Sequence, residues 1–153
     1  MSRAFNFNAG PAALPLEVLE TAQKELVDFG GTGMSIMEHS HRGKAYDAVH
    51  AEAVANMAKL LGATEDYQIL FLQGGASLQF SQVPLNLLGA GQTADYVNSG
   101  EWAGKAIKEA KKVGNVNILA DTSKEIPTNM PDYAALKYTP GAAYVHVTSN
   151  ETI

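Results

Sequence analysis

The feature that most constrains the fold is a short apolar run that ends at two glycines and continues as a helical pattern. Residues 67–72, Tyr-Gln-Ile-Leu-Phe-Leu, have the length of a buried strand, and Gly74 and Gly75 follow them. Helical spacing then begins at Ser77 and runs to Leu88. A strand that turns directly into a helix is the building unit of α/β folds, so the chain is predicted to contain a parallel sheet covered by helices.

The remainder of the sequence extends this alternation in both directions. Further strands are predicted over 93–97, 116–119 and 142–147, with a helix over 101–112. The Gly- and Pro-rich start, 5–15, is predicted to be an extended arm. Two helices should follow it, one over 15–29 with a single buried face and one over 46–61 that ends at Gly62. The predicted class is α/β, with α/β/α layers around a mainly parallel sheet, in one domain that is incomplete.

Composition excludes several functional classes. The net charge is -5, and no stripe of lysine and arginine marks a nucleic-acid surface. The chain has no cysteine, its start lacks the apolar core of a secretory signal, and no apolar run approaches the roughly 20 residues of a membrane span. The histidines His39, His50 and His146 have no metal-ligand spacing. These features predict a cytoplasmic protein that binds neither nucleic acid nor membrane.

The segment from Gly74 to Ser77 is a candidate anion site. Two glycines allow close approach of the backbone, Ala76 is small, and Ser77 can cap the helix and offer its hydroxyl. Unpaired N–H groups at a helix start favour a phosphate. A plain turn with an N-cap serine would have the same sequence. The sequence contains neither a P-loop nor a dinucleotide fingerprint, so ATP and NAD are less favoured as ligands.

Trp102 follows the next predicted strand and is the only tryptophan. An aromatic ring at the carboxyl end of a strand can stack on a planar ligand, although a lone tryptophan often packs its own helix against a sheet. A phosphate site and a stacking ring at neighbouring strand ends predict a ligand that has both a phosphate and an aromatic ring. Pyridoxal phosphate and flavin mononucleotide both satisfy this description.

His41 and Arg42 lie side by side in a predicted loop. A guanidinium is a planar donor for carboxylate or phosphate, so this pair suits an acidic substrate. The alternative is a surface arginine paired with a glutamate. The lysines of the 101–112 helix are most simply a solvated face, and they are Lys105, Lys108, Lys111 and Lys112.

Five separated segments, taken in order, resemble the phosphoserine aminotransferase family. They are NFNAGPAALP, MSIMEHSHRG, QILFLQGGASLQF, ADYVNSGEWAGKAIKEAK and YVHVTSNETI. The resemblance implies a homodimeric fold-type I enzyme that uses pyridoxal 5'-phosphate. It also implies amino transfer between L-glutamate and 3-phosphohydroxypyruvate, giving 2-oxoglutarate and O-phospho-L-serine, in serine biosynthesis and often in pyridoxine synthesis.

Position by position, the resemblance assigns roles to six residues. Ala76 and Ser77 are similar to the cofactor-phosphate site, Trp102 to the ring that stacks on the pyridine, and Thr152 to a further cofactor contact. His41 and Arg42 are similar to the residues that receive the distal acidic group of the substrate.

The family's cofactor lysine, its aspartate partner for the pyridine nitrogen and its small carboxyl-terminal domain are all expected beyond Ile153. Residues 1–153 then form the amino-terminal arm and the first part of the cofactor-binding large domain, with no catalytic residue of their own and no activity alone. Lys24 lies in a similar Ala-Gln-Lys run but precedes the phosphate turn, so it is rejected as catalytic. The alternatives are another fold-type I enzyme, of the desulfurase or alanine-glyoxylate type, and a non-catalytic domain that binds a phosphate ligand.

Overall fold

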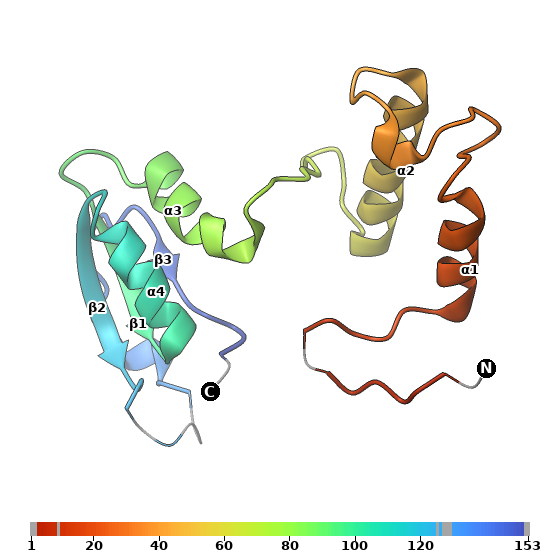
Figure 1. Cartoon of the computed structure of the whole chain (residues 1–153). Helices are drawn as coiled ribbons and strands as arrows, with labels where there is room; N and C mark the ends of the chain where they lie inside the picture. Colours follow the sequence, from red (N-terminus) through yellow and green to blue (C-terminus); the bar gives the residue numbers. More distant parts are fainter. Residues whose placement is uncertain (1–2, 9, 125, 127–129, 152–153) are drawn as a thin grey trace. The chain divides into compact units, whose positions relative to one another are not determined.

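A computed structural model describes residues 3–8, 10–124, 126 and 130–151. The chain divides into two compact units, Met1–Phe71 and Leu72–Ile153. Figure 1 shows the elements of each unit, and the two units are described separately below.

The first unit is built from helices. Helix α1 spans Leu16–Glu25, the 3₁₀ helix η1 spans Ile36–Glu38, and α2 spans Lys44–Leu61. Helix α2 confirms the predicted element and its stop, because Gly62 closes it with a left-handed φ of 62°. Helix α1 ends four residues before the predicted end at Phe29.

The predicted buried face of α1 is wrong for the described part of the first unit. Leu16 and Val18 remain 49% and 48% exposed, and α1 has no buried residue. Among the described residues of this unit only Ser35 is fully buried. An amphipathic helix loses water from its apolar side only where another surface covers it, and no described residue of this unit does so.

The predicted strand over 67–72 is also wrong. These residues form no strand, and the side chains of Tyr67, Leu70 and Phe71 are 72%, 61% and 54% exposed. A strand requires a neighbouring backbone for its hydrogen bonds, and no described strand pairs with this segment. The turn at Gly74 therefore follows a segment without regular secondary structure and not a strand.

The second unit confirms the α/β class. It contains α3 (Gly75–Leu87), β1 (Thr93–Asn98), α4 (Glu101–Ala110), β2 (Asn115–Asp121), η2 (Tyr133–Ala135) and β3 (Val145–His146). The strands lie in the order β2-β1-β3, and both pairings are parallel, as predicted. Strand β3 is shorter than the predicted 142–147 segment.

Helix α4 covers one face of this sheet, as Figure 1 shows. Ala94 and Tyr96 of β1 belong to one apolar core together with side chains of α4. The members from α4 are Ala106, Ile107 and Ala110. Residues alternate between the two faces of a strand, so Asp95 points to the opposite face, where it meets Asn117 and Thr139. Of the layers predicted, this unit contains the sheet and one helical layer.

Gly104 in α4 offers a stabilising substitution. A Cβ built on Gly104 has its nearest neighbour, Asn98 Oδ1, at 3.9 Å, so alanine fits without displacement. Alanine also loses less conformational entropy than glycine in a helix, so Gly104→Ala should raise the free energy of unfolding by about 0.5–1 kcal/mol. Urea unfolding followed by far-ultraviolet circular dichroism measures this change. A loss of stability would contradict the packing described for α4.

Candidate functional site

A pocket of about 560 Å³ opens in the second unit next to the carboxyl ends of β1 and β3. Three elements line it, namely the first turn of α3, the start of α4 and the segment that leaves β3. The lining residues include Ala76, Ser77 and Trp102, together with 146–150. Sites of this size at the carboxyl edge of parallel strands are typical of small-ligand binding.

The first turn of α3 presents backbone N–H groups to this pocket. Gly74 is the N-cap, with a left-handed φ of 95°, and no side chain caps the helix. Since the helix begins at Gly75, Ser77 lies inside its first turn, so the prediction that Ser77 is the cap is wrong. The first N–H groups of a helix have no intrahelical acceptor, and together with the helix dipole they favour an anion.

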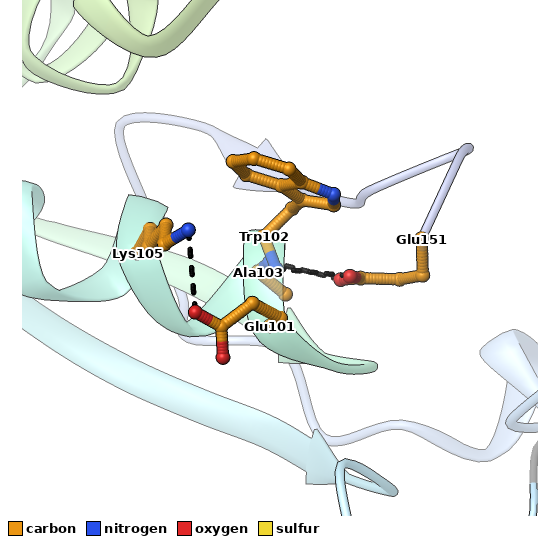
Figure 2. A network of polar contacts seen from close by, with 5 residues as sticks. All are labelled: Glu101, Trp102, Ala103, Lys105 and Glu151. Carbon is orange, nitrogen blue, oxygen red and sulfur yellow. Dashed lines mark hydrogen bonds and ion pairs between the residues drawn. The ribbon is translucent and has the colours of Figure 1, made fainter. Parts of the chain in front are cut away.

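Trp102 borders the same pocket from the first turn of α4. Lys105 Nζ lies 4.0 Å from the centroid of the Trp102 ring and 3.2 Å from Glu101 Oε1. Figure 2 shows the ion pair between Lys105 and Glu101. The prediction that Lys105 belongs to a plain solvated face is therefore incomplete, because this lysine also lies over the indole. Phe80 of α3 lies beside the tryptophan, with ring centroids 6.5 Å apart.

Two further lining residues, His146 and Thr148, were not identified from the sequence. His146 stacks on Tyr96, with ring centroids 4.8 Å apart and planes inclined by 20°. Burial lowers the pKa of the His146 imidazole, against the opposing effect of the Glu151 carboxylate, so the ring is neutral near pH 7. His146 Nδ1 and Thr148 Oγ1 are buried and have no hydrogen-bond partner among the described residues. Their position at the end of a predicted strand was the signal that could have found them.

The other predicted site residues lie elsewhere. His41 and Arg42 are exposed in the turn before α2, where the Arg42 N–H donates to Ser40 Oγ at 3.2 Å. No ion pair to either side chain occurs within the described residues. They belong to the first unit, so the pocket brings together only Ala76, Ser77 and Trp102 of the predicted set. Thr152 lies outside the described residues.

The pocket has the chemistry to bind an anionic group and a planar ring side by side. The anion would meet the open start of α3, and the ring would meet the indole of Trp102. In the described part of the chain, no group of three or more His, Asp or Glu side chains could hold a metal ion. None of the described helices is both long enough and apolar enough to cross a membrane.

Comparison with known proteins identifies the family. The model of the aminotransferase class-V family matches residues 4–153. A phosphoserine aminotransferase of Niallia circulans is 56% identical over 151 residues, which cover 99% of this chain and 42% of that protein. The corresponding enzyme of Bacillus subtilis is 52% identical over 153 residues, again 42% of its length.

Solved structures agree with this result. The phosphoserine aminotransferase of Bacillus circulans subsp. alkalophilus matches with a TM-score of 0.90 over 99% of this chain and 42% of its own. A phosphoserine aminotransferase of Trichomonas vaginalis, solved with bound pyridoxal phosphate, is 42% identical and also has a TM-score of 0.90. The chain thus spans about two fifths of the length of the relatives it matches. On these matches the chain belongs to the class-V aminotransferase family, as a partial-length homologue of phosphoserine aminotransferases.

Proposed function

We propose that this chain supplies the phosphate-binding and ring-stacking part of a pyridoxal-phosphate-dependent phosphoserine aminotransferase. The observation that carries the proposal is that the uncapped start of α3 and the indole of Trp102 line one pocket. The two matching features of the cofactor are its phosphate and its aromatic ring. The family supports the same cofactor, since a related structure contains it.

The residues present fit the cofactor in three respects. The start of α3 offers N–H groups for a phosphate, and Trp102 offers a ring face. His146 and Thr148 add two polar side chains to the lining of the same pocket, which suits a ring that carries polar substituents.

In this proposal the predicted residues bind different parts of the cofactor and the substrate. Ala76 and Ser77 hold the phosphate through backbone N–H groups and the serine hydroxyl, and Trp102 keeps the ring in a fixed plane. Thr152 contacts the cofactor near that ring. His41 and Arg42 receive the distal acid of the substrate, because one cationic site can bind the side-chain carboxylate of glutamate and the phosphate of phosphoserine in turn.

Pyridoxal phosphate, when bound, supplies the carbonyl group and the electron-withdrawing ring on which amino transfer depends. The residues of this chain bind and orient it. We propose that the lysine that bonds its aldehyde lies in the further length that the relatives have, so the 153 residues alone are inactive. The proposal includes the homodimer, the cytoplasmic location, the substrates glutamate and phosphoserine with their keto acids, and a role in serine and pyridoxine synthesis.

Binding of pyridoxine 5'-phosphate to the 153-residue chain tests the site. This compound has the ring and the phosphate but no aldehyde, so it cannot bond to lysine side chains. We expect saturable quenching of Trp102 fluorescence and an affinity about tenfold higher than that of pyridoxine, because the phosphate adds charge-assisted hydrogen bonds at α3. Equilibrium dialysis provides a second measurement that does not depend on the tryptophan.

Two variants locate the binding. Ser77→Ala should lower the affinity for pyridoxine 5'-phosphate about threefold to tenfold, because one hydrogen bond is lost. The affinity for pyridoxine should not change. Trp102→Phe should lower the affinity for both compounds, as measured by equilibrium dialysis. If the phosphorylated compound binds no better than pyridoxine, the assignment of α3 as the phosphate site is wrong.

A further inference from the structure

The start of α4 is capped by a residue far along the chain. Gly100 is the N-cap of α4 and has no side chain, so no local group caps the helix. Glu151 takes over this task, as Figure 2 shows. Its Oε2 accepts a hydrogen bond from Trp102 N at 2.9 Å, and its Oε1 accepts from Ala103 N at 2.8 Å. The Ser99 hydroxyl adds a third, to Oε1 at 3.1 Å.

Gly100 gives the carboxylate the room to approach. A Cβ built on Gly100 would lie 2.9 Å from Glu151 Oε2 and 3.0 Å from its carboxyl carbon. The φ of Gly100 is 167°, an extended value open to any residue, so space is the reason for glycine here. The Glu151 carboxylate can therefore cap α4 only because the N-cap residue has no side chain.

This contact connects two walls of the pocket. Trp102 forms one wall, and 147–150, which end next to Glu151, form another. The carboxylate binds the backbone N–H of Trp102 itself, so it fixes the point from which the indole projects. Lys105 lies over the ring, 4.0 Å from its centroid. The ring is thus positioned both at its backbone and by a cation.

The carboxylate also decides where a second anion can bind. Two helices begin at this pocket, and both starts favour negative charge. Glu151 already supplies that charge to α4, whereas no side chain caps α3. A phosphate would be repelled by the carboxylate at α4 and attracted by the N–H groups at α3.

We propose that Glu151 is a positioning residue that sets the indole of Trp102 for ring stacking and directs the phosphate to α3. The inference rests on the proposed function for the identity of the ligand. The positioning of Trp102, however, is a property of the chain without ligand, so it can be measured separately.

The first arm of the test uses the ligand-free chain. Trp102 is the only tryptophan, so its fluorescence reports this position directly. We expect Glu151→Ala to shift the emission to longer wavelength and to raise the acrylamide quenching constant about twofold, because the first turn of α4 loses its acceptors. The control Glu20→Gln, which removes an exposed carboxylate from α1, should change neither quantity. Unchanged emission and quenching in Glu151→Ala would overturn the proposal.

The second arm separates positioning from simple helix capping. Glu151→Ala should weaken pyridoxine 5'-phosphate about tenfold in equilibrium dialysis. In the double variant Gly100→Ser with Glu151→Ala, a serine N-cap replaces the lost acceptor. We expect this double variant to recover the thermal midpoint of the parent and not its affinity, since the connection to 147–150 stays broken. Full recovery of affinity would reduce Glu151 to a helix cap and contradict the proposal.

The two arms also distinguish this inference from the proposed function. If the parent chain does not bind pyridoxine 5'-phosphate while Glu151→Ala still releases the indole, the cofactor assignment fails and the positioning role holds. If the parent binds the ligand while the indole is unaffected by Glu151→Ala, the positioning role fails and the cofactor assignment holds.

Discussion

Replacing Asp95 by alanine is expected to lower the free energy of unfolding by about 3 kcal/mol or more. Asp95 is fully buried in the central strand, and its carboxylate accepts three hydrogen bonds. Two come from the N–H and the hydroxyl of Thr139, each at 2.7 Å, and one comes from Asn117 Nδ2 at 2.9 Å. Alanine would leave these part-buried donors without their acceptor, which costs about 1–3 kcal/mol for each donor that finds no water. Chemical unfolding followed by circular dichroism measures the loss.

The same carboxylate should make stability depend on pH. Burial raises the pKa of Asp95, but the hydrogen bonds from Thr139 and Asn117 outweigh it, so the net pKa lies below the ordinary value of 3.8. A carboxyl group with a lowered folded-state pKa stabilises the fold above its unfolded pKa, and this contribution disappears as the pH falls through the folded pKa. The difference in unfolding free energy between the parent and Asp95→Asn should therefore be constant near pH 7 and shrink below about pH 4. A difference that stays constant down to pH 2 would contradict this account.

The second large effect is expected at Gly74. Its φ of 95° is unfavourable for any residue with a Cβ, at about 1–2 kcal/mol. A Cβ at this position would also lie 2.5 Å from Leu78 Cδ2 and 2.8 Å from Leu78 Cβ, so the first turn of α3 would have to move. Overpacking of this kind costs about 1–3 kcal/mol more. Gly74→Ala should thus lower the unfolding free energy by about 2–5 kcal/mol and weaken the binding of pyridoxine 5'-phosphate at the same turn.

Gly75 provides the matched control for this prediction. Its φ is 62°, and a Cβ there meets no heavy atom within 4 Å. Gly75→Ala should therefore cost only the conformational part, about the same 1–2 kcal/mol. Equal losses in the two variants, measured by urea unfolding, would show that the contact with Leu78 has no energetic weight.

The elements that the sequence predicted well are those set by local physics. Gly62 ends α2 because a left-handed residue closes a helix, and this requirement is visible in the sequence. The parallel pair of β1 and β2 follows from two apolar runs separated by a helix. For the same reason the sequence predicts that Trp102 follows the end of a strand, and the structure confirms this, since Trp102 lies in the first turn of α4, after β1.

The failures occur where distant residues decide the outcome. The segment 67–72 has the composition of a buried strand, but no described strand bonds to it. Glu151 gave no local signal of its role, because its partners Trp102 and Ala103 lie 49 and 48 residues away. The sequence shows His146 only as a histidine outside any metal cluster, since its stacking on Tyr96 depends on the pairing of β1 with β3.

The distance between Glu151 and α4 sets an order of events during synthesis. Chains are made at about 5–20 residues per second, so Glu151 is added roughly 2–10 s after Trp102. During that interval the first N–H groups of α4 can be satisfied only by water. Closing a loop of this length also carries an entropic cost that a local cap avoids. The contacts that hold the first turn of α4 can therefore form only after residue 151 has been added to the chain.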